Sequence, residues 1–409
     1  MNSLPRVIKT VGLAFAAALA HSAPAPKEAG TGAPYAASLE TIEVVADEAP
    51  VTLAGTTLAT VKKGRWFGVT ARAADTLRIQ FWGGRNLRTA WLQAAHVRVL
   101  TDESVDLTTE ALKLAGEFNP KLDVAAYRAR VDALAARVAR AAAEGATAQE
   151  KALRISRQLF GPEGFRYEVT PRTLDRVLDE KRGNCLGLSL LYLCAAEKLK
   201  LAFHMLPFPQ HALIRYDDGR EQFNVEPSFG GMLLVDDAYM RRRFGPPQGI
   251  SWTVLSKPQT MTMLYSDVGG MLGDQKRLAE ATSCFTRAIE INPNYGAAYY
   301  NWGNVLAALN QPALACEKYS RATQLHPRFA IAYNNWGSTL GKMGEFQWAA
   351  DKFATAAQLD PGSAMAHLNW GMVLLNLGKR QEAADKLGRA VELQPSLRPF
   401  VDQALGQKP

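Results

Sequence analysis

The sequence predicts a multidomain protein with a small all-β barrel, an α+β core and an all-α solenoid. Short apolar strands separated by Gly, Asp and Asn fill residues 39–100. Helical periodicity mixes with strand alternation over residues 105–250. Beyond residue 262 the tripeptide Asn-Trp-Gly recurs at equal intervals, at Asn301, Asn335 and Asn369. A chain of 409 residues has enough material for two or three domains with cores of their own.

The C-terminal repeat is the strongest pattern in the sequence. Prolines follow the same interval, at Pro293, Pro327, Pro361 and Pro395. A period of about 34 residues is that of the tetratricopeptide (TPR) repeat, a pair of antiparallel helices. We therefore expect four TPR repeats over residues 262–397 and a tail at 398–409. Such repeats stack into a curved surface that binds a protein or peptide ligand.

The N-terminal strands are expected at residues 42–45, 58–61, 66–70 and 77–82, and at 91–92 with 97–100. Lys63-Gly64 before one strand and Trp91 before the closing strand resemble a bacterial SH3-like domain. That family's groove often holds peptide or cell-wall ligands. We interpret Trp66, Trp82 and Trp91 as core residues rather than as a binding platform.

Residues 105–182 are expected to form helices that pack around the segment that follows them. Thr147 and Glu150 form a capping box, which predicts the start of one helix. Thr170-Pro171 predicts the start of another, and Gly183 its end.

The run RGNCLGLS at residues 182–189 places a cysteine in the first turn of an apolar helix. Asn184 is the expected N-cap, because Gly183 and Asn184 do not easily continue a preceding helix. Cys185 then lies where unpaired N–H groups and the helix dipole favour a thiolate. The same N–H groups can stabilise an oxyanion, with Asn184 as support. The alternative is that Cys185 is a small buried hydrophobic residue.

Two predicted strands flank Asp218-Gly219, which is a strong hairpin signal. With these two residues as the loop, His211 lies directly opposite Glu226, and a four-residue loop keeps the pair together. A carboxylate beside an imidazole fixes its tautomer and raises its basicity. The alternative is an ordinary exposed ion pair. Together with Cys185, we interpret His211 and Glu226 as a Cys-His-acid triad.

Three stretches together resemble the transglutaminase-like superfamily: RGNCLGLS, the tripeptide Pro-Gln-His that ends at His211, and NVEPSFGG at residues 224–231. More narrowly, the chain resembles a bacterial branch in which this core, here residues 105–250, is followed by TPR repeats. The resemblance implies a papain-like site with Cys185, His211 and Glu226 at its three motif positions. The superfamily more often has Asp in the third position, so Glu226 is a departure. Some members of the branch lack the cysteine.

The first residues have the pattern of a secretory signal. Arg6 and Lys9 precede an apolar run at residues 11–20, and small residues follow up to Ala23. We expect a signal peptide at residues 1–23, a linker rich in Pro and Gly at 24–38, and a periplasmic or secreted protein. No later run is long and apolar enough to span a bilayer.

Charge and cysteine spacing exclude several classes of site. The net charge is +8, but the sequence lacks the concentrated basic and aromatic pattern of a nucleic-acid binder. The four cysteines do not have the spacing of a zinc site. Cys185 and Cys194 are roughly 13 Å apart along one predicted helix, too far to form a disulfide. We expect no metal and no cofactor.

The sequence thus predicts an exported thiol enzyme that acts on an amide bond of a protein or a cell-wall peptide, by hydrolysis or acyl transfer. The SH3-like and TPR modules would select its substrate. The alternative function is a non-catalytic scaffold of the cell envelope, in which barrel and repeats present two surfaces joined by an inactive core.

Overall fold

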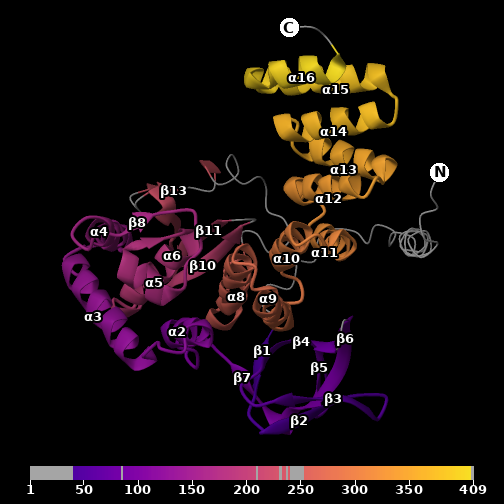
Figure 1. Cartoon of the computed structure of the whole chain (residues 1–409). Helices are drawn as coiled ribbons and strands as arrows, with labels where there is room; N and C mark the ends of the chain where they lie inside the picture. Colours follow the sequence, from indigo (N-terminus) through magenta and orange to yellow (C-terminus); the bar gives the residue numbers. More distant parts are fainter. Residues whose placement is uncertain are drawn as a thin grey trace. The chain divides into compact units, whose positions relative to one another are not determined.

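The computed structural model describes residues 40–83, 86–208, 211–229, 233–235, 238–239 and 253–406 (Figure 1). The expected signal peptide and linker, residues 1–38, lie outside this part of the chain, as do residues 209, 210, 230 and 231 of the motif stretches. All-β, α+β and all-α regions follow one another as expected. Within the described residues, no helix is both long and apolar enough to cross a membrane.

The N-terminal region is a seven-stranded antiparallel sheet in the order β3-β2-β6-β5-β4-β1-β7. Its fold is consistent with an SH3-like domain. The short 3-10 helix η1 (Ala94–His96) precedes the last strand. The strands are β1 (Thr41–Val44), β2 (Glu48–Leu53), β3 (Thr56–Lys62), β4 (Trp66–Ala73), β5 (Thr76–Gly83), β6 (Asn86–Gln93) and β7 (Val97–Leu100).

This sheet differs from the prediction in two ways. Strand β2 was not among the predicted strands; it contains Pro50, and only Ala49 and Val51 are buried in it. The three tryptophans are half-buried and lie outside the sheet's core. Strand alternation explains this, because the neighbouring Phe67, Phe81 and Leu92 take the inward positions.

The α+β core is built around α6 (Cys185–Lys198), whose residues are nearly all buried. It packs on α3, α4 and strands β10 and β11. The other helices are α2 (Leu107–Phe118), α3 (Val124–Ala142), α4 (Ala148–Phe160) and α5 (Leu174–Glu180). The main sheet is antiparallel, in the order β10 (Phe203–Phe208), β11 (His211–Asp217), β12 (Gln222–Glu226) and β13 (Leu233–Val235), with η2 (Pro227–Phe229) between the last two.

The segment before α6 differs from the expected long helix. Helix α5 starts after Thr173 rather than at residue 170, and Lys181 ends it with a left-handed φ of 55°. Arg172 donates to Glu168 at 2.8 Å and to Glu180 at 2.6 Å, which holds the residues before the helix. Because α5 ends at Glu180, Arg182–Gly183 form a short strand, β9, which pairs in parallel with β8 (Arg166–Tyr167).

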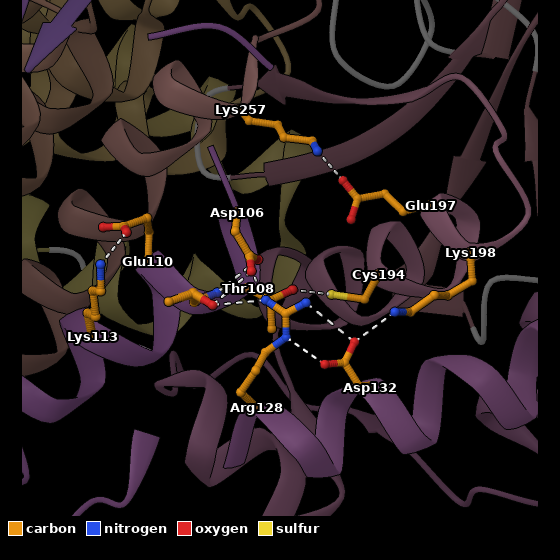
Figure 2. A network of polar contacts seen from close by, with 11 residues as sticks. Asp106, Thr108, Glu110, Lys113, Arg128, Asp132, Cys194, Glu197, Lys198 and Lys257 are labelled. Atoms are coloured by element: carbon orange, nitrogen blue, oxygen red, sulfur yellow. Dashed lines mark hydrogen bonds and ion pairs between the residues drawn. The ribbon is translucent and has the colours of Figure 1, made fainter. Parts of the chain in front are cut away.

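Polar contacts join the far end of α6 to α2 and α3, as Figure 2 shows. Asp132 accepts from Arg128 at 2.9 Å and from Lys198 at 2.8 Å. Thr108 Oγ1 lies 2.8 Å from Cys194 Sγ. These contacts fix the C-terminal half of α6 and so hold its N-terminus in place.

The C-terminal helices confirm the TPR prediction. Helices α10, α12 and α14 begin one repeat period apart, and so do α9, α11, α13 and α15. Helix α8 starts before its periodic position, because Ser256 caps it and a proline follows. The pairs are α8 (Lys257–Asp274) with α9 (Leu278–Ile291), α10 (Gly296–Ala308) with α11 (Pro312–Leu325), α12 (Ala330–Lys342) with α13 (Phe346–Leu359), and α14 (Ala364–Asn376) with α15 (Arg380–Leu393).

The expected tail is partly helical. After the turn η3 (Pro395–Leu397), helix α16 (Arg398–Leu405) covers the last repeat, and Val401 is buried against it. A terminal helix of this kind shields the open end of a repeat stack.

A buried carboxylate lies in the contact between the β-sheet domain and the repeats. Glu290 on α9 is 2% exposed, pairs with Arg65, and accepts the backbone N–H of Trp82 at 3.1 Å. The ring of Trp82 meets Trp302 edge-on, with centroids 5.3 Å apart. Burial raises the pKa of Glu290, and Arg65 and the Trp82 N–H, which both lower it, offset only part of the rise.

Candidate active site

Helix α6 carries the expected nucleophile at its first position. Asn184 is the N-cap, because its Oδ1 accepts the backbone N–H of Gly187 at 2.9 Å. Cys185 follows at the first helical position and is buried. The N–H of Leu188 donates to the Asn184 carbonyl, and no hydrogen bond within the described chain takes the N–H of Cys185 or Leu186. Two donors of the first turn are therefore unpaired within the described chain.

The β11–β12 hairpin brings the histidine and the acid together in a different register from the expected one. Its four-residue loop, 218–221, is centred one residue later than the expected loop at Asp218-Gly219, so His211 and Glu226 are diagonal neighbours rather than direct partners. Asp218 holds the loop at this position, since its Oδ1 accepts the N–H of Arg220 at 2.9 Å and of Glu221 at 2.8 Å. A shift of two residues preserves strand alternation, so both side chains stay on one face.

Glu226 is held at both oxygens. Its Oε2 lies 2.7 Å from His211 Nε2, and its Oε1 accepts the N–H of Ser228 at 2.9 Å and the Ser228 hydroxyl at 2.6 Å. The side chain is only 1% exposed. Burial alone favours the protonated acid, but the bonds from His211 and Ser228 outweigh it and lower the pKa of Glu226. The carboxylate is thus a fixed negative charge beside the imidazole.

His211 lies between the acid and the sulfur. Burial acts to lower the pKa of His211, but hydrogen bonds with Cys185 and Glu226 and their charges raise it to about 9. An imidazole with this pKa is a cation at neutral pH. The structure thus brings Cys185, His211 and Glu226 into one chain of contacts, with Asn184 at the helix start.

A cavity of about 600 Å³ opens at Cys185. His211, Leu186 and Phe208 line it on the α+β side. The opposite wall comes from α8 and α10, the first helices of the first two repeats. The site is therefore a cleft between the α+β core and the repeat array, in the size range of ligand pockets.

Asp267 on α8 is a site residue that sequence reasoning missed. Its Oδ2 accepts a hydrogen bond from Asn184 Nδ2 at 2.7 Å. Burial raises the pKa of Asp267 to about 6, and the bond from Asn184 limits the rise. The repeat pattern held a signal for it, because Asp267 stands one period before Asn301, where the later repeats have asparagine.

Two tyrosines, also missed, lie near the sulfur. Tyr167 on β8 and Tyr295 before α10 both line the cavity. Burial, followed by the charge of Cys185 and Glu226, raises the pKa of Tyr167. Burial, then the charges of Asp267 and Cys185, raises the pKa of Tyr295. Both phenols remain hydrogen-bond donors at neutral pH.

The other three cysteines occupy different surroundings. Cys194, in the C-terminal half of α6, lies next to Thr108 (Figure 2). It borders a second cavity of about 250 Å³. Burial raises the pKa of Cys194 to about 11 and those of Cys284 and Cys316 to about 12. All four cysteines are free thiols. In the described part of the chain, no group of three or more His, Cys, Asp or Glu side chains is placed to hold a metal ion.

Comparison with known families matches two regions of the chain. Residues 125–251 match the model of the transglutaminase-like superfamily, and residues 264–295 match that of a tetratricopeptide repeat. Two curated relatives, each named UPF0162 protein, come from Xylella fastidiosa. The protein of strain Temecula1 is 23% identical over 240 residues, which cover 53% of this chain and 84% of the relative. That of strain 9a5c is 23% identical over 234 residues, covering 51% and 82%.

Several solved structures are similar to about a third of this chain. YrrB, described as a TPR protein with an unusual peptide-binding site, is 29% identical, with a TM-score of 0.30, over 33% of this chain and 69% of its own. Pseudomonas aeruginosa pilF is 23% identical, with a TM-score of 0.33, over 36% and 67%. MamA is 21% identical, with a TM-score of 0.32, over 34% and 81%.

Proposed function

We propose that this chain, which carries a transglutaminase-like domain followed by TPR repeats, is an exported thiol enzyme that acts on amide bonds of a protein or peptide. The observation that carries the proposal is the contact series from Cys185 to His211 to Glu226 at a helix N-terminus. A cationic imidazole beside a sulfur favours the thiolate, the form of cysteine that attacks carbonyl carbon.

The proposed reaction has two steps. The Cys185 thiolate attacks the amide carbon and forms a C–S bond, and the carbonyl electrons move to oxygen. When the tetrahedral intermediate collapses, the C–N bond breaks and the His211 imidazolium gives its proton to the leaving amine. Water or a second amine then attacks the thioester and loses a proton to His211, and the C–S bond breaks.

Each supporting residue has a physical role in this scheme. Nε2 of His211 is held by Glu226, which assigns the other ring nitrogen, Nδ1, to the sulfur. The N–H groups of Cys185 and Leu186 are the proposed oxyanion donors. Asn184 supports them indirectly, because its side chain is engaged with Gly187 and Asp267.

The repeats support binding of a protein or peptide. A cell-wall peptide and a periplasmic or secreted location remain part of the proposal, motivated by the signal-like residues 1–23. The competing function is a scaffold, for which the observation is the buried Glu290 contact that fixes the β-sheet domain on the repeats.

An activated ester tests the chemistry without a known substrate. We expect p-nitrophenyl acetate to acetylate Cys185, with a burst of about one p-nitrophenol per protein seen by absorbance and by intact mass. Cys185→Ala should abolish the burst, whereas the matched variant Cys194→Ala should keep it. Added primary amine would divert the acetyl group if the enzyme is a transferase. Equal acetylation of wild type and Cys185→Ala would favour the scaffold.

A further inference from the structure

The repeat side of the cleft is formed by one row of residues on each of two helices, α8 and α10. On α8 the cavity is lined by Met263, Ser266, Asp267, Gly270 and Asp274, which lie on one face of a helix. A second row, on α10, includes Ala297, Asn301, Asn304 and Ala308. The cleft that begins at Cys185 therefore extends along the first two repeats rather than ending at the α+β core.

The length of the row on α8 fits an elongated occupant. Met263 and Asp274 are eleven positions apart on α8, which corresponds to about 16 Å along a helix. An extended peptide covers that distance in about five residues. A single side chain would leave most of the 600 Å³ unfilled.

The chemistry of these rows fits a peptide backbone. Asn301 Nδ2 donates to Ser266 Oγ at 3.0 Å, and Asn335 Nδ2 donates to Asn304 Oδ1 at 3.0 Å. These bonds fix amide and hydroxyl groups in a row along successive inner helices. Asn side chains carry both donors and acceptors, so they can meet the N–H and C=O groups of any peptide sequence.

Gly270 keeps the middle of the cleft open. A Cβ built at Gly270 meets no atom within 4 Å, although the residue lies inside helix α8. The equivalent position in the next repeat is Asn304. Gly273 differs, because a Cβ there would lie 2.3 Å from Val305 Cγ2, so helix packing already explains that glycine. Space, rather than packing, is what the absent side chain of Gly270 supplies.

We propose that the acyl donor is an extended polypeptide of about five or more residues, which lies along α8 and α10 with its reactive carbonyl at Cys185. The first two repeats are then one wall of the active-site cleft, and substrate recognition and catalysis share one surface. This inference rests on the proposed thiol chemistry.

Two electrophiles of different length test it on the full chain. Chloroacetone is small and contacts little besides the sulfur of Cys185. A mixture of randomised hexapeptide chloromethyl ketones is long enough to bind along α8 and α10 as well. Modification rates of Cys185 are read by peptide mass spectrometry. In wild type we expect the peptide reagents to react at least about tenfold faster than chloroacetone, which is the gain from about 1.4 kcal/mol of binding.

Gly270→Trp should reduce that ratio to near one by filling the cleft. Gly270→Ala adds only a methyl group and should keep it, since alanine also favours the helix. Ala308→Trp, at an exposed position on the same wall, gives a second blocking variant should Gly270→Trp fold poorly. The matched control is Ala279→Trp, exposed on α9, which is not a lining residue of the cleft.

The outcomes separate the two proposals. If chloroacetone modifies Cys185 but the peptide reagents react no faster, the proposed peptide site on the repeats is wrong and the thiol chemistry stands. The same conclusion holds if the peptide reagents stay faster in both blocking variants. A Cys185 that reacts with chloroacetone no faster than Cys194 overturns both. Loss of the advantage in the blocking variants alone supports the inference.

Discussion

Asn184 Nδ2 lies 2.7 Å from Asp267 Oδ2, and this bond joins the N-cap of the cysteine helix to the first helix of the repeats. The other end of the same amide caps α6 through Gly187. One asparagine thus connects the backbone turn that presents Cys185 to the array that lines its cleft. Asp267 acts on the site through Asn184 and is a positioning residue.

A double-mutant cycle measures this connection. Asn184→Ala should cost about 1 kcal/mol of unfolding free energy for the lost cap, and more for the unpaired Asp267 carboxylate. Combined with Asp267→Ala, the loss should be less than additive by about 0.5–3 kcal/mol in urea unfolding. Asp267→Asn keeps an acceptor for Asn184 and should restore Cys185 alkylation, which Asp267→Ala slows. Strict additivity, with no rescue by Asn, would contradict the connection.

Stability should depend on pH through His211. Its pKa in the folded protein, about 9, lies above its ordinary value of 6.5, so its contribution is complete below pH 6.5 and is lost as pH rises through 9. Glu226 has a lowered pKa, so its contribution is complete above its ordinary value of 4.5 and is lost as pH falls through the lower folded value. Both contributions are complete between about pH 4.5 and 6.5.

The measurement compares the urea unfolding free energy of wild type and His211→Gln. The gap between them should shrink by up to about 3 kcal/mol from pH 6 to pH 10, at about 1.4 kcal/mol for each pKa unit. His204→Gln on the neighbouring strand β10 is the matched control variant. A gap that is constant over this range would mean that His211 is not held as a cation.

The negative charge of Glu226 should matter more than its shape. Glu226→Gln keeps a similar side chain but removes the charge, so the His211 pKa should fall and Cys185 alkylation should slow, most of all toward pH 9. Ser228→Ala should have a smaller effect, because the bond to His211 remains. Glu144→Gln, an exposed charge on the surface, is the control. Unchanged alkylation in Glu226→Gln would remove the acid from the site.

The Glu290 contact should hold the β-sheet domain on the repeats. Glu290→Ala leaves the N–H of Trp82 and the Arg65 guanidinium without their partner and should cost about 1–3 kcal/mol. Hydrogen exchange should then accelerate in β4 and β5, which carry or flank the contact. Glu382→Ala, an exposed residue on α15, should leave that exchange unchanged. Equal exchange in both variants would show that the contact does not restrain this domain.

Features with local signals were predicted well from the sequence. The TPR period fixed the helix pairs, because each repeat buries the same positions. The cap of α6 followed from Gly183-Asn184 before an apolar run. The hairpin was predicted, but the position of its loop was not, because the side chain of Asp218 accepts the N–H groups of Arg220 and Glu221 and places the loop at 218–221.

Features that depend on distant contacts were not predictable in the same way. Asn184 and Asp267 are 83 positions apart, and Arg65 and Glu290 are 225 apart. No periodic pattern links such pairs. The repeat period only shows that Asp267 occupies, in the first repeat, the position that is asparagine in the later ones. The outward position of Trp82 likewise makes sense only beside Trp302 on the repeats.

The pH dependence of Cys185 alkylation by iodoacetamide tests the central claim most directly. Cys194, Cys284 and Cys316 serve as internal controls, because burial raises the pKa of each thiol. In the full chain we expect Cys185 to be labelled fastest, with labelling that persists well below pH 8 and is lost in His211→Ala. Labelling of Cys185 no faster than the other three, or unaffected by His211→Ala, would contradict an imidazole-activated nucleophile.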